Sequence, residues 1–126
     1  MSVRALTFDA AGTLIEIAEP VGETYARIAV RHGIDVAPAE VEARFRAAMS
    51  AAPPLAFAGV SAVGLRARER EWWRAVVRGS LGDPTNVSAF DRCFDELFLH
   101  YSRADAWRVF PDVPAALGAL HARGLV

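Results

Sequence analysis

Lysine is absent from this chain of 126 residues, and all 14 of its basic side chains are arginines. Chemistry that needs a lysine amine, such as Schiff-base formation, therefore has no residue to carry it here. Cysteine occurs once, at Cys93, so no disulfide can form within the chain, and a reducing compartment such as the cytoplasm is expected. The sequence also lacks a signal-peptide pattern and any apolar run near the roughly 20 residues of a membrane-spanning helix.

An excess of charge of one sign is lacking as well. The chain has 14 basic and 15 acidic residues, a formal net charge of −1. This balance gives no electrostatic reason to expect nucleic-acid or membrane partners. Hydrophobic residues make up 53% of the chain and charged residues 23%, enough apolar material for one packed domain or a small core with an insert.

The first organised stretch is Val3 to Phe8, a short apolar run that predicts a buried strand. It ends at Asp9, and Gly12 and Thr13 follow. A strand that leads an acid into a turn places the carboxylate at the C-terminal edge of a parallel sheet, where open α/β sheets bind ligands. The small residues after Asp9 let backbone N–H groups approach an anion. These residues alone fit a turn-forming Asp9 as well as a nucleophile.

Helical patterns follow, separated by glycine and proline. The predicted helices run from Glu19-Pro20 to Gly33, from Pro38 to Pro53, from Ser61 to about Gly79, from Pro84 to Tyr101, and from Asp112 to Gly124. Leu125-Val126 begin another predicted strand. One strand cannot form a sheet, so we expect either a fragment of a larger α/β protein or a strand that pairs with another molecule, as in a homodimer.

The stretch F-D-A-A-G-T-L at residues 8–14, the helical insert, and F-P-D-V-P-A-A-L-G-A-L-H-A-R-G-L at 110–125 resemble the haloacid dehalogenase-like (HAD) hydrolase superfamily. Residues 25–34 and 71–77 resemble its domain-containing protein 3 branch. The resemblance implies an α/β fold: the N-terminal part of a Rossmann-type core with an inserted four-helix cap. It implies a core strand and nucleophile loop at residues 1–15, a helical cap at 16–103, and a return to the core at 104–126.

The resemblance also implies a site. The family's first motif is D-x-D-G-T, which makes Asp9 the catalytic nucleophile and Ala10, Ala11, Gly12 and Thr13 the substrate-binding loop. In the phosphatases of the family, Mg²⁺ binds the carboxylate of Asp9 and the backbone carbonyl at Ala11. The second aspartate, which protonates the leaving group, is Ala11 here. Because such acid–base assistance contributes about 10²–10⁴ in rate, the expected activity is a weak phosphatase on a small phosphorylated substrate.

Three alternatives to a weak phosphatase exist, and the absence of lysine excludes one of them. A 2-haloacid dehalogenase needs no acid at position 11, but those enzymes resemble D-A-Y-G-T, with tyrosine where this chain has Ala11. Phosphonoacetaldehyde hydrolases carry D-x-A-G-T but need a cap lysine, which this chain lacks. A non-catalytic member that acts as a binding module is the third. The later motifs of the family lie beyond residue 126, so a molecule of these 126 residues alone is expected to be inactive.

The remaining reactive or aromatic residues have structural explanations. Cys93 falls in an apolar helical stripe and is expected in the core. The histidines are expected near helix C-termini, not as metal ligands. Trp72 and Trp73 are expected in the core, with lining of a substrate cavity as the alternative. The arginines at 66, 70, 74 and 78 are expected on a solvated face, with phosphate contact as the alternative. Asp112 is expected as a helix N-cap.

Overall fold

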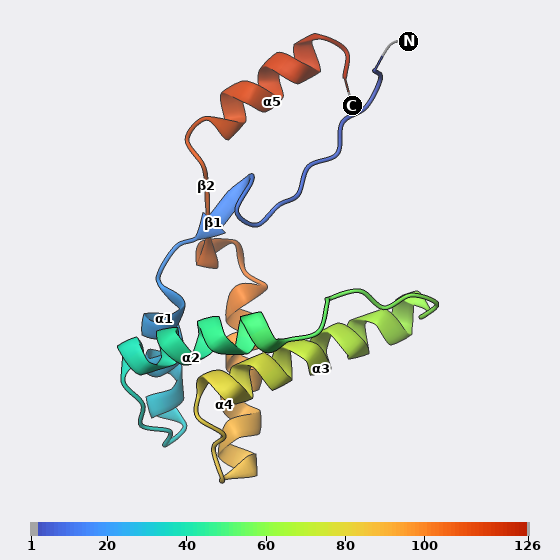
Figure 1. The fold of residues 1–126 in the computed structure, drawn as a ribbon. Helices are drawn as coiled ribbons and strands as arrows, with labels where there is room; N and C mark the ends of the chain where they lie inside the picture. The colour runs from blue at the N-terminus through green and yellow to red at the C-terminus, as the bar shows by residue number, and fades with distance from the viewer. Residues whose placement is uncertain (1–2, 126) are drawn as a thin grey trace. The chain divides into compact units, whose positions relative to one another are not determined.

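The structure, a computed structural model, describes residues 3–125 and divides the chain into two compact units. One unit is Glu19–His100, and the other combines the residues up to Ala18 with those from Tyr101 onward. Within residues 3–125 the chain is mostly helical and contains one small two-stranded sheet, in accord with an α/β fold (Figure 1). None of the described helices is both long enough and apolar enough to cross a membrane.

Four helices make up the larger unit and confirm the predicted helix positions. They are α1 (Val21–Arg31), α2 (Pro38–Ala51), α3 (Ala62–Ser80) and α4 (Val87–Tyr101), whose last residue passes into the other unit. The predicted boundary residues have the expected geometry. Gly33 ends α1 with φ of +75°, and the Ser61 hydroxyl accepts a hydrogen bond of 3.3 Å from the Gly64 N–H.

The core of this unit is built from buried side chains of all four helices. Fully buried side chains come from α1 (Ile28), α2 (Val41) and α4 (Phe90, Phe94 and Leu97). These residues belong to the stripes that the helical spacing predicted. Met49 in α2, Leu65 in α3 and Val87 in α4 are exposed, although their apolar character and helical spacing would place them with the buried residues.

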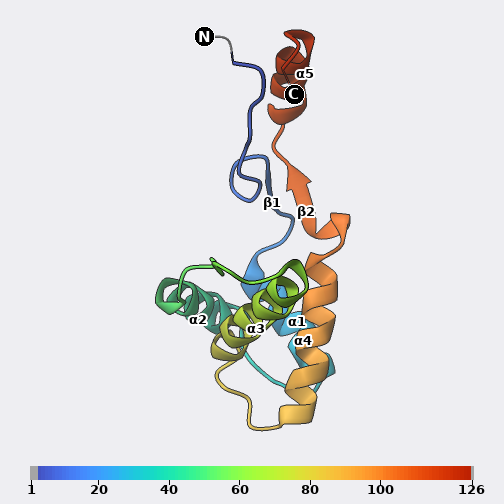
Figure 2. The same cartoon turned by 90° about the vertical axis from the view of Figure 1, so that its right-hand side faces the viewer.

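The contact between α1 and α2 requires a glycine. A Cβ atom at Gly22 would lie 2.3 Å from the Pro38 carbonyl oxygen, which is closer than two non-bonded atoms can come. The Gly22 N–H donates to Glu42 Oε2 at 2.9 Å, so the first turn of α1 is satisfied by a side chain of α2. Figures 1 and 2 show α2 also running beside α3.

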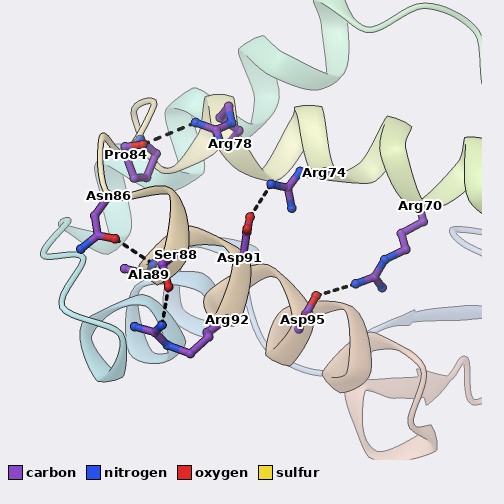
Figure 3. A network of polar contacts seen from close by, with 10 residues as sticks. All are labelled: Arg70, Arg74, Arg78, Pro84, Asn86, Ser88, Ala89, Asp91, Arg92 and Asp95. Carbon is purple, nitrogen blue, oxygen red and sulfur yellow. Dashed lines mark hydrogen bonds and ion pairs between the residues drawn. The ribbon is translucent and has the colours of Figure 1, made fainter.

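The predicted solvated face of α3 holds for Arg66, which is exposed, whereas Arg70, Arg74 and Arg78 make contacts that the prediction did not include. Figure 3 shows Arg70 and Arg74 extending from α3 toward α4, and Arg78 extending toward Pro84 in the loop before α4. Arg74 pairs with Asp91, Arg70 pairs with Asp95, and the Arg78 guanidinium lies 4.2 Å from the Phe90 ring centroid. The prediction was incomplete for these three arginines because it counted charge alone. An arginine can lay its planar group on an aromatic ring while it reaches a carboxylate at the surface.

The smaller unit contains a sheet that the sequence did not predict. Strand β1 (Ile15–Ile17) pairs antiparallel with β2 (Trp107–Val109), with Ile15 opposite Val109 (Figure 2). A short 3₁₀ helix, η1 (Ala104–Ala106), precedes β2, and α5 (Val113–Ala122) follows it. Three-residue strands show too little alternation to be recognised from sequence. Their pairing joins the two chain segments that flank the helical unit.

The predicted buried strand at Val3–Phe8 is wrong for the described structure. These residues are exposed and belong to no paired strand, and Figure 1 shows them as an extended segment. A strand forms only where a neighbour accepts its backbone hydrogen bonds, and within residues 3–125 no strand lies beside this segment. Of the second predicted strand, Leu125 is coil and Val126 lies outside the described residues.

Candidate functional site

The loop after Asp9 folds back on itself around a single carbonyl group. The Ala10 carbonyl accepts hydrogen bonds from the N–H groups of Thr13 at 3.2 Å, Leu14 at 2.8 Å and Ile15 at 3.1 Å. Gly12 has φ of +81° and donates its N–H to the Ile15 carbonyl at 2.8 Å. Glycine is suited to that position, because a side chain at positive φ would clash with its own backbone. The loop is thus a tight, internally bonded turn.

The two-stranded sheet holds this turn at its base. The Phe110 N–H donates to the Leu14 carbonyl at 3.1 Å, and β1 starts at the next residue, Ile15, opposite Val109. A segment from the far end of the chain therefore fixes the end of the loop. The sequence did not identify Leu14, Ile15, Val109 or Phe110 as part of the site. The alternation in I-E-I at 15–17 was the only signal, and it is too short to be specific.

Asp9 presents an open carboxylate. The residue is exposed, and no hydrogen bond or ion pair joins its side chain to another residue in the described range. Ala11 is exposed too, two residues further along. The carboxylate therefore has no internal partner that would hold it back from a ligand. An attacking carboxylate needs this accessibility.

The amide groups of the predicted binding loop fall into two sets. Gly12 and Thr13 use their N–H groups inside the turn, as donors to Ile15 and Ala10. Among the described residues, the N–H groups of Ala10 and Ala11 have no backbone acceptor. These two amides directly follow Asp9, so they are the donors that an anion beside the Asp9 carboxylate can reach without opening the turn.

The donor set around Asp9 fits a magnesium ion only in part. Within residues 3–125, no group of three or more His, Cys, Asp or Glu side chains gathers as a metal site. The loop offers one carboxylate, from Asp9, and the Ala11 carbonyl, which accepts no backbone hydrogen bond from a described residue. Both are oxygen donors of the kind that Mg²⁺ prefers, and that ion often keeps only one or two protein carboxylates alongside water and phosphate.

The other reactive residues lie in the helical unit, where they have structural partners. Cys93 is fully buried, and burial raises the pKa of its thiol to about 11. His32 lies at the end of α1, with its Nε2 at 2.7 Å from Glu96 Oε2, and Arg31 pairs with the same carboxylate. The core position of Cys93 and the helix-terminal position of His32 are as predicted.

Two further predictions are met in part. Asp112 stands at the N-cap position of α5, but its side chain accepts no capping hydrogen bond. Trp72 is half-buried and donates its indole N–H to the Pro53 carbonyl at 2.8 Å. It lines a groove of about 400 Å³ between α2 and α3, inside the helical unit. Trp72 is therefore partly packed within the helical unit and partly exposed in the groove.

Comparison with known proteins gives a consistent result over the whole chain. The family model described as a haloacid dehalogenase-like hydrolase matches residues 3–126. Haloacid dehalogenase-like hydrolase domain-containing protein 3 of Mus musculus is 34% identical over 99% of this chain. The proteins of the same name from Homo sapiens and Danio rerio are 31% and 30% identical over 99% and 98% of it. The match covers 50% of the mouse and human proteins and 51% of the zebrafish protein, so the chain spans about half the length of these relatives.

Proposed function

The chain belongs to the haloacid dehalogenase-like hydrolase family, and on that premise we propose that it provides the nucleophile loop of a hydrolase acting on small phosphorylated substrates. The observation that carries the proposal is Asp9 itself. Its carboxylate stands open beside two unused backbone N–H groups, at the first position of F-D-A-A-G-T-L. A carboxylate beside free amide donors suits attack on an anionic, electrophilic centre.

In the proposed reaction, an Asp9 oxygen attacks the phosphorus atom of the bound substrate. A bond forms between this oxygen and phosphorus, the bond to the leaving-group oxygen breaks, and the enzyme carries an acyl-phosphate until water releases phosphate. The N–H groups of Ala10 and Ala11 would orient the phosphate oxygens and stabilise their developing charge. Members of the family generally use Mg²⁺, which would be held by the Asp9 carboxylate and the Ala11 carbonyl and would offset the negative charge of the phosphate.

Ala11 sets the limit of this activity. A methyl side chain cannot donate a proton to the departing oxygen, so a poor leaving group such as an alkoxide would leave slowly. Phosphate esters whose leaving group departs without a proton are affected far less. We therefore propose a phosphatase that is weak toward ordinary alkyl phosphates and more active on esters with good leaving groups.

The helical residues would serve as the cap over such a site. Supporting this, Glu19–His100 form a compact unit of their own, and β1 and β2 pair directly before and after it in the chain. We accordingly propose core segments at residues 1–15 and 104–126 and a four-helix cap at 16–103. A cap that closes over bound substrate excludes water from the reacting groups.

The test is phosphate release by the intact gene product. With an aryl phosphate and Mg²⁺, activity of the wild type should fall to background in Asp9→Asn, because an amide is not an attacking group. Asp35→Asn is the matched control: it makes the same change at an exposed aspartate of the helical unit and should leave activity unchanged.

Three outcomes would overturn the proposal in different ways. Full activity in Asp9→Asn would show that Asp9 is not the nucleophile. Halide release from a 2-haloacid without metal, with no phosphate release from any ester, would identify a dehalogenase. A wild type that hydrolyses neither kind of substrate would favour a non-catalytic binding module.

A further inference from the structure

The groove between α2 and α3 lies on an open face of the helical unit. Small side chains shape it: Ala48, Ala51 and Ala52 come from the end of α2, and Ala75 comes from α3. Phe57 and Trp72 provide aromatic surface, and Arg68 and Glu71 complete the α3 side. An apolar surface rimmed by charged groups is typical of a contact with another macromolecule.

Four residues form a stripe along α3, and three of them, Arg68, Glu71 and Ala75, line this groove. Gly64, Arg68, Glu71 and Ala75 follow one another at intervals of four, three and four residues, which places them on the same side of the helix. Arg68, Glu71 and Ala75 are exposed, and Gly64 is partly so. Read from either end, the stripe has the order small residue, charged residue, charged residue, small residue, with the two charges of opposite sign.

The two charges of the stripe have no partner within the described part of the chain. The ion pairs of residues 3–125 include neither Arg68 nor Glu71. On the opposite side of the same helix, Arg70 and Arg74 are paired with aspartates of α4. The fold therefore satisfies the arginines that face α4 and leaves the charges beside the groove available.

Two exposed leucines lie close in sequence to the stripe and the groove. Leu65 is 42% exposed and lies one helical turn from Arg68, and Leu55 in the connection between α2 and α3 is 46% exposed. Trp72 and Phe57 line the groove itself, so apolar surface accompanies the charged pair. Covering such surface is the main driving force of association, while charges set its direction.

We propose that this stripe is the centre of an interface between two copies of the chain, with the two α3 helices antiparallel about a twofold axis between Arg68 and Glu71. A twofold interface uses the same patch on both subunits, so the patch must complement itself. In this arrangement Arg68 lies opposite Glu71 of the partner subunit, and the same pair forms again by symmetry. Ala75 lies opposite Gly64 of the partner subunit. Val60 covers Gly64 within each copy, so the close approach rests on the small side chain of Ala75.

A partner with a different surface explains the stripe less well. A strongly acidic or basic partner would meet one favourable and one repulsive charge, three residues apart. A copy of the same helix in the opposite direction meets both charges with their complements. The inference does not depend on Asp9 or on hydrolysis, because the stripe lies wholly within the helical unit.

Charge reversal tests the interface on the intact gene product by sedimentation equilibrium. The wild type should form a dimer, and Arg68→Glu and Glu71→Arg should each raise its dissociation constant at least about tenfold, since each opposes like charges twice. Mixing the two single variants should restore a dimer, because one then carries two acids and the other two bases. The double variant Arg68→Glu, Glu71→Arg should also dimerise.

Arg66→Glu is the matched control, since it reverses one charge of α3 away from the groove and should not change the dissociation constant. Circular dichroism melts of each variant establish that it is folded. A monomeric wild type at every concentration would overturn the proposal. So would single reversals that leave a wild-type dimer intact, or a mixture of the two variants that stays monomeric.

Discussion

At the scale of single residues, Asp9 and Ala11 decide what chemistry this loop can support. Asp9 provides a carboxylate with no internal partner, and Ala11 provides only a methyl group two residues later. The turn between Ala10 and Ile15 does not use the Ala11 side chain, and that side chain is exposed. A carboxylate at position 11 would therefore have space, and the turn would keep its hydrogen bonds.

Replacing Ala11 with aspartate should raise the proposed phosphatase activity. The new carboxylic acid would protonate the leaving oxygen, which is worth about 10²–10⁴ in rate for esters that need a proton. The gain should be large for an alkyl phosphate and small for an aryl phosphate with a good leaving group, measured as kcat/KM on the intact gene product. Ala11→Asn, which fills the same space without an acid, is the control. Equal gains in both variants would contradict general-acid assistance.

Cys93 should make stability depend on alkaline pH. Burial raises the pKa of its thiol from 9.0 to about 11, so between these values the unfolded chain loses a proton that the folded chain keeps. The free energy of unfolding should therefore fall as pH rises from about 9 to about 11. Urea titrations across this range measure the slope, and Cys93→Ala should reduce it. An unchanged slope in the variant would show that other groups cause the pH dependence.

At the scale of elements, α3 illustrates how one residue type serves different purposes on two sides of a helix. Arg70 and Arg74 lie over the phenylalanine rings of α4 and reach its aspartates, as Figure 3 shows for the ion pairs. Arg68 lies beside the groove and has no ion pair in the described residues. In the sequence, the paired and the unpaired arginines of α3 look alike. They differ only because α4 lies beside Arg70 and Arg74.

Removing Arg74 should weaken the contact between α3 and α4. Its guanidinium lies 5.0 Å from the Phe90 ring centroid and also pairs with Asp91, and its side chain is 26% exposed. We expect Arg74→Ala to lower the free energy of unfolding by about 1–2 kcal/mol. Arg66→Ala, on the same helix, should change it by less than about 0.5 kcal/mol.

A double-mutant cycle with Asp91→Ala separates the two contributions of Arg74. The coupling energy between Arg74 and Asp91 should be about 0.5–1 kcal/mol and should decrease in high salt. The remainder of the Arg74→Ala effect should persist in high salt, because it comes from packing on the rings. A coupling energy near zero would assign the whole effect to packing.

At the scale of the whole molecule, buried residues are distributed unequally. The helical unit Glu19–His100 has a continuous apolar core that includes Ile28, Phe90 and Phe94. In the other unit, Ala106 and Val113 are the buried residues of the described range. Stability in this chain should therefore be concentrated in the helices, while the loop after Asp9 depends on its turn and on β1 and β2.

Hydrogen exchange should report this division directly. In the 126-residue chain, amides of α4 around Phe94 should exchange slowly, because they open only when the core opens. Amides from Val3 to Asp9 should exchange near the rate of an unfolded peptide, since they are exposed and outside any helix or strand. Mass spectrometry of exchanged peptides measures both. Equal protection of the two segments would contradict the division.

The sequence by itself determined the elements whose cause is local. Periodic apolar residues, with proline and glycine at the ends, defined the helices, and the short motif around Asp9 indicated the candidate loop. The core residues of α4 were also predictable, because a stripe at helical spacing must be buried somewhere. The family followed from the motif combined with the order of elements, and the comparisons confirm it.

Only the tertiary structure decided the features that depend on distant neighbours. The pairing of β1 with β2, the coil at Val3–Phe8, and the placement of Arg74 on Phe90 each depend on which segment lies alongside. Backbone hydrogen bonds of a strand and the environment of a charged side chain come from residues far away in the chain. A local pattern can say that a group needs a partner, but it cannot say which partner the fold supplies.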